Sequence, residues 1–331
     1  LPVAFLDFLK ENGVDPSVYL PRYIRLKHGI PEIEAELNCK LEKVAWLLGF
    51  FALPPQIQIA GSKSYRNGKV YGIDAASGAA VVALDISHGD HVLDLCAAPG
   101  AKLCMLAELL GGSGSLTGVD IARHRLAACR TMLQKYALED RCRLFVADGT
   151  TFSLPPFRYS EWTPRKSWKE RKKVNSARPE LIFYGKHSGL VGLSKSELGY
   201  DKVLVDAECT HDGSFRHIQK YERWGWETLQ HRLLCAQRIA TLTDLQLQLL
   251  SNGFRLLKVG GSLVYSTCSL TIAQNEGVVK QFLSGNPSAG LKEIDAAQNW
   301  PCRNGGIPNT IRFDPLTSQT SGLFIAKIVK L

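Results

Sequence analysis

Two cysteines in matching local settings carry the strongest chemical signal in this sequence. Cys209 lies in KVLVDAECT and Cys268 in GGSLVYSTCSL, and each follows an apolar run that predicts a β-strand. Both thiols are therefore expected at the carboxyl ends of strands, the edge at which open α/β sheets bind ligands. A thiol in such a place can act as a nucleophile or in acid–base chemistry.

A third strand end, HVLDLCAAPGAK at 91–102, adds a turn of small residues that opens a helix. Small residues let the backbone approach a ligand closely, and a helix N-terminus presents free N–H groups. Asp120 comes 20 residues after Gly100, at the next strand end, where an acid suits ribose hydroxyls. Asp148 ends the third strand and is placed to face an adenine ring. Because the turn is not G-x-G-x-x-G, S-adenosylmethionine is favoured over a dinucleotide. A cofactor turn and two thiols together predict an enzyme with a covalent cysteine intermediate.

The elements around these residues predict an α/β fold. From residue 75 onward strands and helices alternate, and repeated βα units imply a mostly parallel, doubly wound sheet. We expect residues 75–331 to form this main domain and residues 1–74 a small N-terminal α+β subdomain, which either packs as a cap or positions substrate.

Three further elements are predicted from hydrophobic spacing. IPEIEAELNCKLEKVAWLL at 30–48 has apolar residues at helical spacing, and LPPQIQIAG at 53–61 alternates like a strand. The segment from His231 to Gly261 is predicted as one long helix that ends in a Gly-Gly turn.

Bulk composition narrows the class of protein. The 331 residues are 45% hydrophobic and carry a net charge of +9 with a pI near 9.1, which weakly favours a polyanionic partner. Nine cysteines, an odd number with no C-x-x-C pair, indicate a reduced intracellular protein and no metal site. No apolar run reaches the ~18 residues that span a bilayer, so no membrane association is expected.

Residues 158–195 interrupt the strand–helix alternation. The stretch 151–198 contains ten Lys or Arg and four Asp or Glu, a net +6. Such a segment is either a solvated loop or an arm that contacts RNA, with Trp162 and Trp168 available to stack on bases.

Taken in order, the motifs resemble those of the RNA (cytosine-5) methyltransferases of the NSUN/RsmB type. The matching segments cover about 65–331 and read YGIDAASGAAV, LDLCAAPGAK, GVDIARHRL, VADGT, VLVDAECT, YSTCSL, NEGVV and SGLFIAKIVK. The resemblance implies a class I methyltransferase fold, Rossmann-like, and an enzyme of the EC 2.1.1 class. Its partner would be RNA, with transfer RNA the first choice and ribosomal RNA the next, and the chain is expected to be a monomer.

The resemblance also assigns residues. It implies that S-adenosylmethionine is bound by Cys96, Ala97, Ala98, Pro99, Gly100, Ala101, Lys102, Asp120, Arg125, Asp148 and Asp206. It further implies that Cys268 is the nucleophile, that Cys209 aids product release, that Asp206 holds the target cytosine and that Lys102 lines the active site.

The chemistry of cytosine agrees with these roles. Addition of a thiolate to C6 makes C5 nucleophilic enough to take a methyl group. A helix expected to begin near Thr271, together with Lys102, would lower the pKa of Cys268. His211 and His217, near Cys209, are candidate bases, but a polar histidine in a loop more often has no such role, so both are expected to be ordinary loop residues.

The chain departs from the family at its release cysteine. The family pattern D-A-P-C-S-G is here Asp206-Ala207-Glu208-Cys209-Thr210, and the carboxylate of Glu208 would raise the pKa of Cys209. The cofactor turn also has Ala101 and Leu103 in place of Gly and Thr. We still expect activity, with a distinct substrate or release rate.

Two alternatives remain open from the sequence. A DNA cytosine-5 methyltransferase also uses a thiol, but its nucleophile lies in a Pro-Cys motif after the fourth strand. This chain lacks the proline of that motif and has the additional cysteine of S-T-C-S. An RNA-binding assembly factor without useful turnover is favoured by Glu208 and opposed by the intact Cys268, Asp206 and Lys102.

Overall fold

The structure is a computed structural model that describes residues 3–15, 20–26, 29–156, 179–185, 199–214, 218 and 225–331. Its helices are α1 (Val3–Glu11), α2 (Ile30–Leu37), α3 (Lys63–Arg66), α4 (Ala75–Val82), α5 (Ala101–Leu110), α6 (Arg123–Lys135), α9 (Trp226–Leu234), α10 (Ala236–Leu256), α11 (Val278–Gly285) and α12 (Pro315–Ser318). A π-helical turn, Ala273–Gly277, precedes α11, and a 3₁₀ turn spans Asp295–Asn299.

The strands form two sheets. They are β1 (Arg22–Leu26), β2 (Glu42–Lys43), β3 (Phe50–Leu53), β4 (Val70–Gly72), β5 (His91–Asp94), β6 (Ser115–Asp120), β7 (Cys142–Val146), β8 (Glu180–Tyr184), β9 (Tyr200–Asp206), β10 (Leu257–Thr267), β11 (Ala289–Lys292), β12 (Cys302–Asn304), β13 (Thr310–Phe313) and β14 (Leu323–Lys330). The smaller sheet has the order β2-β3-β1-β4. The larger has the order β12-β13-β14-β10-β9-β5-β6-β7-β8, with β11 paired to β14.

The chain divides into two compact units. The first comprises 1–83, 207–248 and 265–327, and the second comprises 84–206, 249–264 and 328–331. Strands β10 and β14 contribute residues to both. The boundary expected after residue 74 remains a prediction.

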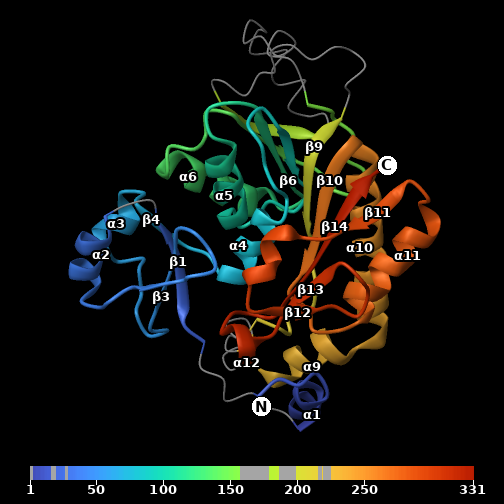
Figure 1. The fold of residues 1–331 in the computed structure, drawn as a ribbon, viewed down its shortest axis with the longest axis horizontal. Coiled ribbons are helices and arrows are strands. Elements are labelled where there is room, and N and C mark those ends of the chain that lie inside the picture. Colours follow the sequence, from blue (N-terminus) through green and yellow to red (C-terminus); the bar gives the residue numbers. More distant parts are fainter. Residues whose placement is uncertain are drawn as a thin grey trace, which may run out of the picture. The chain divides into compact units, whose positions relative to one another are not determined.

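The second unit contains the parallel strands that the sequence predicted. Strand β5 pairs in parallel with β6 and β9, and β6 pairs in parallel with β7. Helices α5 and α6 contact each other and lie against β6 and β7 (Figure 1). They bury Leu106, Leu126 and Leu133, which recur on the inner helix faces. This is the crossover arrangement of a Rossmann-like α/β fold, and the predicted fold class is confirmed.

Two elements near the N-terminus, a helix and a strand, differ from the prediction. The helix expected over 30–48 ends at Leu37, because Asn38 adopts a left-handed conformation with φ 48°. Leu48, expected on its apolar face, is 86% exposed. The strand expected over 53–61 occupies Phe50–Leu53 instead, and the two prolines that follow lead into a turn.

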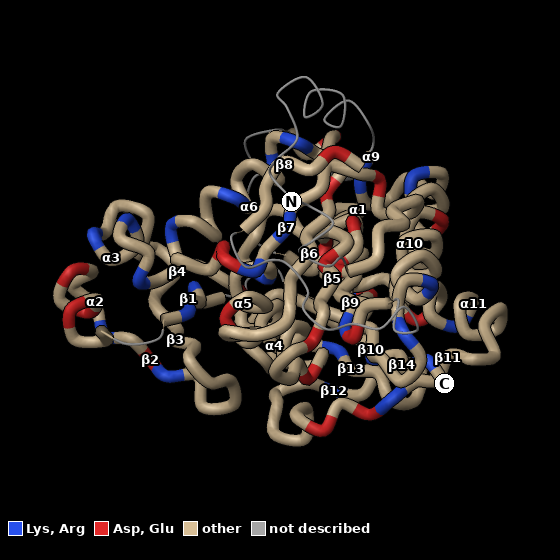
Figure 2. Tube along the Cα trace, turned by 90° about the horizontal axis from the view of Figure 1, so that it is seen from above, with Lys and Arg blue, Asp and Glu red and all other residues tan. Residues whose placement is uncertain are grey.

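The helices of this N-terminal part have opposite charge. Helix α2 carries three glutamates and α3 carries Lys63 and Arg66, so they are red and blue respectively in Figure 2. The Glu36 carboxylate accepts a hydrogen bond from the Ser64 N–H at 2.9 Å, which joins the two helices.

Two other expectations are corrected. The long helix expected from His231 to Gly261 is interrupted at Cys235, whose backbone is extended, and its last five residues belong to β10. Within 158–195 the sequence missed β8, which pairs antiparallel with β7. Within 158–195 the structure describes only residues 179–185. Trp162 and Trp168 therefore lie outside the described residues. Among the helices in the described ranges, none is both long enough and apolar enough to cross a membrane.

Candidate active site

The predicted cofactor turn connects β5 to α5 in the second unit. Gly100 has φ 108°, and a Cβ added there would lie 3.1 Å from the Cα of Cys129, so glycine is required for close packing. No side chain caps the first turn of α5, which leaves its N–H groups directed at the turn. The Cys96 N–H donates to the Asp94 carboxylate at 3.2 Å, and this bond orients the turn.

The other predicted cofactor residues fall into two groups. Asp120 and Arg125 hold the turn: Asp120 accepts from the Ala98 N–H at 3.1 Å, and Arg125 Nη2 donates to the Ala98 carbonyl at 3.0 Å. Asp120 is only 7% exposed. Asp148, by contrast, is exposed and accepts from the Thr150 N–H at 2.9 Å.

Lys102 and Asp206 are brought together although they are 104 residues apart in the chain. The Lys102 Nζ atom lies 2.7 Å from Asp206 Oδ2, with the side chains 17% and 27% exposed. Lys102 is the second residue of α5 and Asp206 ends β9, the strand beside β5. The ammonium donates, so the Asp206 carboxylate accepts from it.

The carboxyl of Asp94, the last residue of β5, is fully buried near the Lys102–Asp206 pair. Burial raises the pKa of Asp94 to about 7, and the negative charge of Asp206 acts in the same direction. With a pKa of about 7, Asp94 is about half protonated at neutral pH, which limits the negative charge next to the Lys102–Asp206 pair.

We expect Asp94→Asn to stabilise the protein at alkaline pH and to leave it almost unchanged in acid. The unfolded carboxyl ionises near pH 4 and the folded one near pH 7, so ionisation of Asp94 lowers stability progressively as pH rises between these values. The full effect above pH 7 corresponds to about 4 kcal/mol, which the asparagine variant would not lose. Melting temperatures measured from pH 4 to pH 8 check this. Asp85→Asn, at an exposed site, controls for the loss of one negative charge.

The donors, acceptors and charges of these residues suit S-adenosylmethionine. The glycine turn and uncapped helix end offer N–H donors, and carboxylates follow three strand ends, at Asp120, Asp148 and Asp206. Such an acidic edge suits ribose hydroxyls, an adenine amino group and a cationic sulfonium. The structure thus provides a suitable donor set in this unit.

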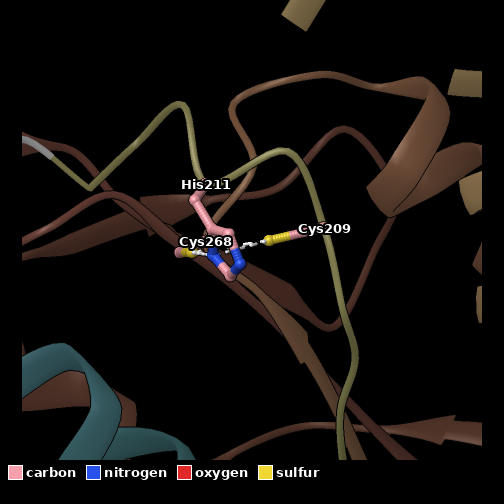
Figure 3. A group of neighbouring side chains, drawn as sticks. All are labelled: Cys209, His211 and Cys268. Carbon is pink, nitrogen blue, oxygen red and sulfur yellow. Dashed lines mark hydrogen bonds between the residues drawn. The ribbon is translucent and has the colours of Figure 1, made fainter. Parts of the chain in front are cut away.

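The two cysteines singled out by the sequence lie together in the first unit, with a histidine beside them (Figure 3). Cys209 Sγ is 3.4 Å from Cys268 Sγ. His211 Nδ1 is 3.1 Å from Cys268 Sγ and 3.6 Å from Cys209 Sγ. Cys209 is 3% exposed, whereas Cys268 and His211 are partly exposed.

Backbone contacts fix the two cysteine loops against each other. The Ala207 N–H donates to the Ser266 carbonyl at 3.0 Å, and the Gly213 N–H donates to the Cys268 carbonyl at 2.9 Å. A Cβ on Gly213 would lie 2.6 Å from that carbonyl oxygen, so only glycine permits this approach. The loop after β9 is therefore held in position on both sides of its thiol.

A buried network of polar side chains supports both loops. Gln274 Nε2 donates to Thr210 Oγ1 at 2.9 Å and to Ser269 Oγ at 3.0 Å. Gln246 Nε2 donates to the Glu208 carbonyl at 2.8 Å and to Gln274 Oε1 at 3.2 Å. Gln246 and Gln274 are fully buried, so each of these bonds, if lost, would leave a desolvated polar group.

The sequence did not anticipate this network or the place of His211. A glutamine in a predicted helix and a histidine in a predicted loop carry no local signal of contact with a distant thiol. His217, the other candidate base, lies outside the described residues.

One electrostatic expectation is corrected. The pKa of Cys209 is lowered well below its usual value, first by its hydrogen bond with Cys268 and then by His211, although the exposed Glu208 precedes it. The helix expected near Thr271 begins two residues later, as the π-helical turn. A lowered pKa for Cys268 stays a prediction.

The three donor atoms of the thiol–histidine cluster lie within 4.8 Å of one another. Their hydrogen bonds account for this spacing, and the absence of a metal remains a prediction.

Comparison with known proteins decides the family. The family model described as "16S rRNA methyltransferase RsmB/F" matches residues 81–156 and 189–329. The chain belongs to this family. Its members are S-adenosylmethionine-dependent RNA cytosine-5 methyltransferases, so the cofactor expected from the sequence is that of the family.

Individual relatives and structures agree with this placement. The mouse 5-cytosine rRNA methyltransferase NSUN4 is 34% identical over 210 residues, which cover 63% of this chain and 44% of that protein. The zebrafish mitochondrial tRNA (cytosine(34)-C(5))-methyltransferase is 27% identical over 254 residues, covering 74% and 55%. A crystal structure of a methyltransferase homologue from Pyrococcus horikoshii matches with a TM-score of 0.68 and 25% identity over the whole of both chains. The chain spans about half the length of the curated relatives it matches.

Proposed function

We propose that this chain is an S-adenosylmethionine-dependent RNA cytosine C5 methyltransferase that acts through a covalent bond between Cys268 and C6 of the base. The observation that carries the proposal is the pair of thiols 3.4 Å apart on the two loops that follow β9 and β10. A lone structural cysteine needs no second thiol beside it, whereas addition followed by release requires two reacting groups. Membership of the RsmB/F family supplies the reaction class.

Different residues serve as the nucleophile, as the group that releases the product and as the group that recognises the base. The Cys268 sulfur adds to C6, which raises electron density at C5. S-adenosylmethionine supplies the methyl group as an electrophilic sulfonium. Cys209 then takes the C5 proton, since its low pKa favours the thiolate. Loss of that proton lets the sulfur–C6 bond break.

Asp206 is suited to recognising cytosine over uracil. Lys102 donates to its Oδ2 atom, so the carboxylate is an acceptor. A carboxylate can accept from the exocyclic amino group of cytosine, but the corresponding uracil oxygen would repel it. A base inside a duplex must first be exposed before C6 can be attacked.

Ribosomal RNA is the proposed substrate. This choice reverses the order expected from sequence, and it rests on the family description and on the mouse relative, both of which name rRNA. Transfer RNA is the second candidate, because the zebrafish relative modifies tRNA.

The test is transfer of tritiated methyl groups from S-adenosylmethionine to separate, unmodified rRNA, tRNA and DNA, followed by nucleoside analysis. Label in 5-methylcytidine from rRNA is expected. Label confined to tRNA would select the second candidate. Label in 5-methyluridine or in DNA, or none in any pool, would contradict the proposal.

A further inference from the structure

His211 is the one side chain in the thiol cluster that the proposed reaction has not used (Figure 3). Its Nδ1 atom lies within hydrogen-bond reach of both sulfurs, at 3.1 Å from Cys268 and 3.6 Å from Cys209. An imidazole within hydrogen-bond reach of two thiols can take a proton from one and later return it.

The conformation of His211 adds an independent reason to look for a role. Its φ is 59°, in the left-handed region where glycine is the usual residue, and the family pattern D-A-P-C-S-G has glycine in this place. The chain therefore keeps a side chain at a position whose backbone favours none, and strain of this kind clusters at functional sites.

The hydrogen bonding of the cluster creates a need for a base. The two sulfurs are 3.4 Å apart and share a hydrogen bond, which lowers the pKa of Cys209. When Cys268 is the donor of this bond it holds its proton, and a protonated thiol is a poor nucleophile. Another group must remove that proton before the sulfur can attack C6.

We propose that His211 is a catalytic proton carrier that serves the two thiols in turn, an inference that rests on the function proposed above. The S–H bond of Cys268 breaks and its proton moves to Nδ1, which leaves a thiolate beside an imidazolium. The thiolate forms the bond to C6. When that bond breaks at release, the electron pair returns to sulfur and the imidazolium gives its proton back. The C5 proton, taken by Cys209, leaves the site through Nδ1 to solvent.

The other titratable groups around the cluster are already engaged. Asp212 accepts from the Leu270 N–H at 2.7 Å and from the Thr210 hydroxyl. Glu276 accepts from Arg312 Nε at 2.8 Å. Glu208 is exposed on the same loop. Among the residues that the structure describes around the cluster, the remaining rival base for Cys268 is Cys209 itself.

The experiment measures the rate at which iodoacetamide alkylates Cys268 as a function of pH, followed by mass spectrometry of the full-length chain. His211→Gly removes the imidazole at a position whose backbone suits glycine. We expect alkylation of Cys268 near neutral pH to fall by at least about 10-fold and its midpoint to move to higher pH, toward the value of a free thiol near 8.5. Added imidazole should restore part of the rate. Melting temperatures confirm that each variant is folded.

Two comparisons make the result decisive. His88→Ala, at an exposed loop position, should leave the alkylation profile unchanged. Cys209→Ser should shift the Cys268 profile less than His211→Gly does. An unchanged midpoint in His211→Gly, or a larger shift in Cys209→Ser, would overturn the proposal.

Methyl transfer gives the second readout. In a single turnover on the RNA that accepts label, His211→Gly is expected to lose ~10²–10⁴-fold in rate, the usual contribution of a positioned base. Alkylation needs neither RNA nor S-adenosylmethionine, so it separates the two proposals. If no RNA is methylated but the thiol still depends on His211, the proposed reaction fails and the activation of Cys268 stands.

Discussion

Replacing Cys268 with alanine is expected to lower methyl transfer by at least about 10⁴-fold, because removing a nucleophile closes the covalent route. C5 of cytosine is too weak a nucleophile to take the methyl group unless C6 has first been attacked. The neighbouring Cys209 is buried, so it should not take over the attack. The measurement is tritium incorporated into 5-methylcytidine under single-turnover conditions.

Binding of the cofactor should survive this substitution. The residues assigned to S-adenosylmethionine belong to the second compact unit, whereas Cys268 belongs to the first. We expect the dissociation constant of sinefungin, measured by calorimetry, to change by less than about twofold, well under 1 kcal/mol. Cys302→Ala is a matched control, since this thiol also lies in the first unit and donates to the Ala297 carbonyl.

A residual rate above a tenth of wild type in Cys268→Ala would show that Cys268 is not the nucleophile. The double variant with Cys209→Ala would then locate the attack. A fall to background in both the single and the double variant is the expected pattern.

Replacing Cys209 with alanine is expected to leave the protein covalently attached to its RNA after one turnover. The sulfur–C6 bond can break only after the C5 proton has left, and Cys209 is the acidic thiol 3.4 Å from the nucleophile. Turnover should fall by at least ~10²-fold, the lower end for loss of a positioned acid–base group. A slow-migrating protein–RNA band on a denaturing gel measures the trapped species.

The adduct must depend on the chemistry proposed for it. The double variant Cys209→Ala/Cys268→Ala should show no band, because no sulfur is available to bond C6. If Cys209→Ala turns over normally and forms no adduct, the release role belongs to another group, and His211 would be the first to examine. Cys209→Ala also deletes two hydrogen bonds, so its melting temperature should be compared with wild type.

The binding-only alternative makes opposite predictions for both variants. A factor that only binds RNA would keep its affinity in Cys268→Ala and would form no adduct in Cys209→Ala. The exposed Glu208, which had favoured this alternative, does not raise the pKa of Cys209. The structure therefore removes the physical argument that the release cysteine is impaired.

The sequence alone determined those features that depend on neighbouring residues. Strands β5, β6, β7 and β9 and the second part of β10 were predictable, because each is a mostly apolar run bounded by glycine or polar residues. The positions of Cys209, Cys268 and Asp206 at strand ends followed from the same patterns. Helices end at Asn38 and at Cys235, but the hydrophobic spacing continues past both residues, so the predicted helices were too long.

The tertiary structure decided which of these residues meet. Lys102 and Asp206 are 104 positions apart and Cys209 and Cys268 are 59 apart, and no local pattern encodes such contacts. The order of strands in the sheet brings them together. The same packing buries Gln274 and places His211 Nδ1 beside both sulfurs. Hydrogen bonding in this cluster then lowers the pKa of Cys209, an effect that depends on the whole fold rather than on residue type.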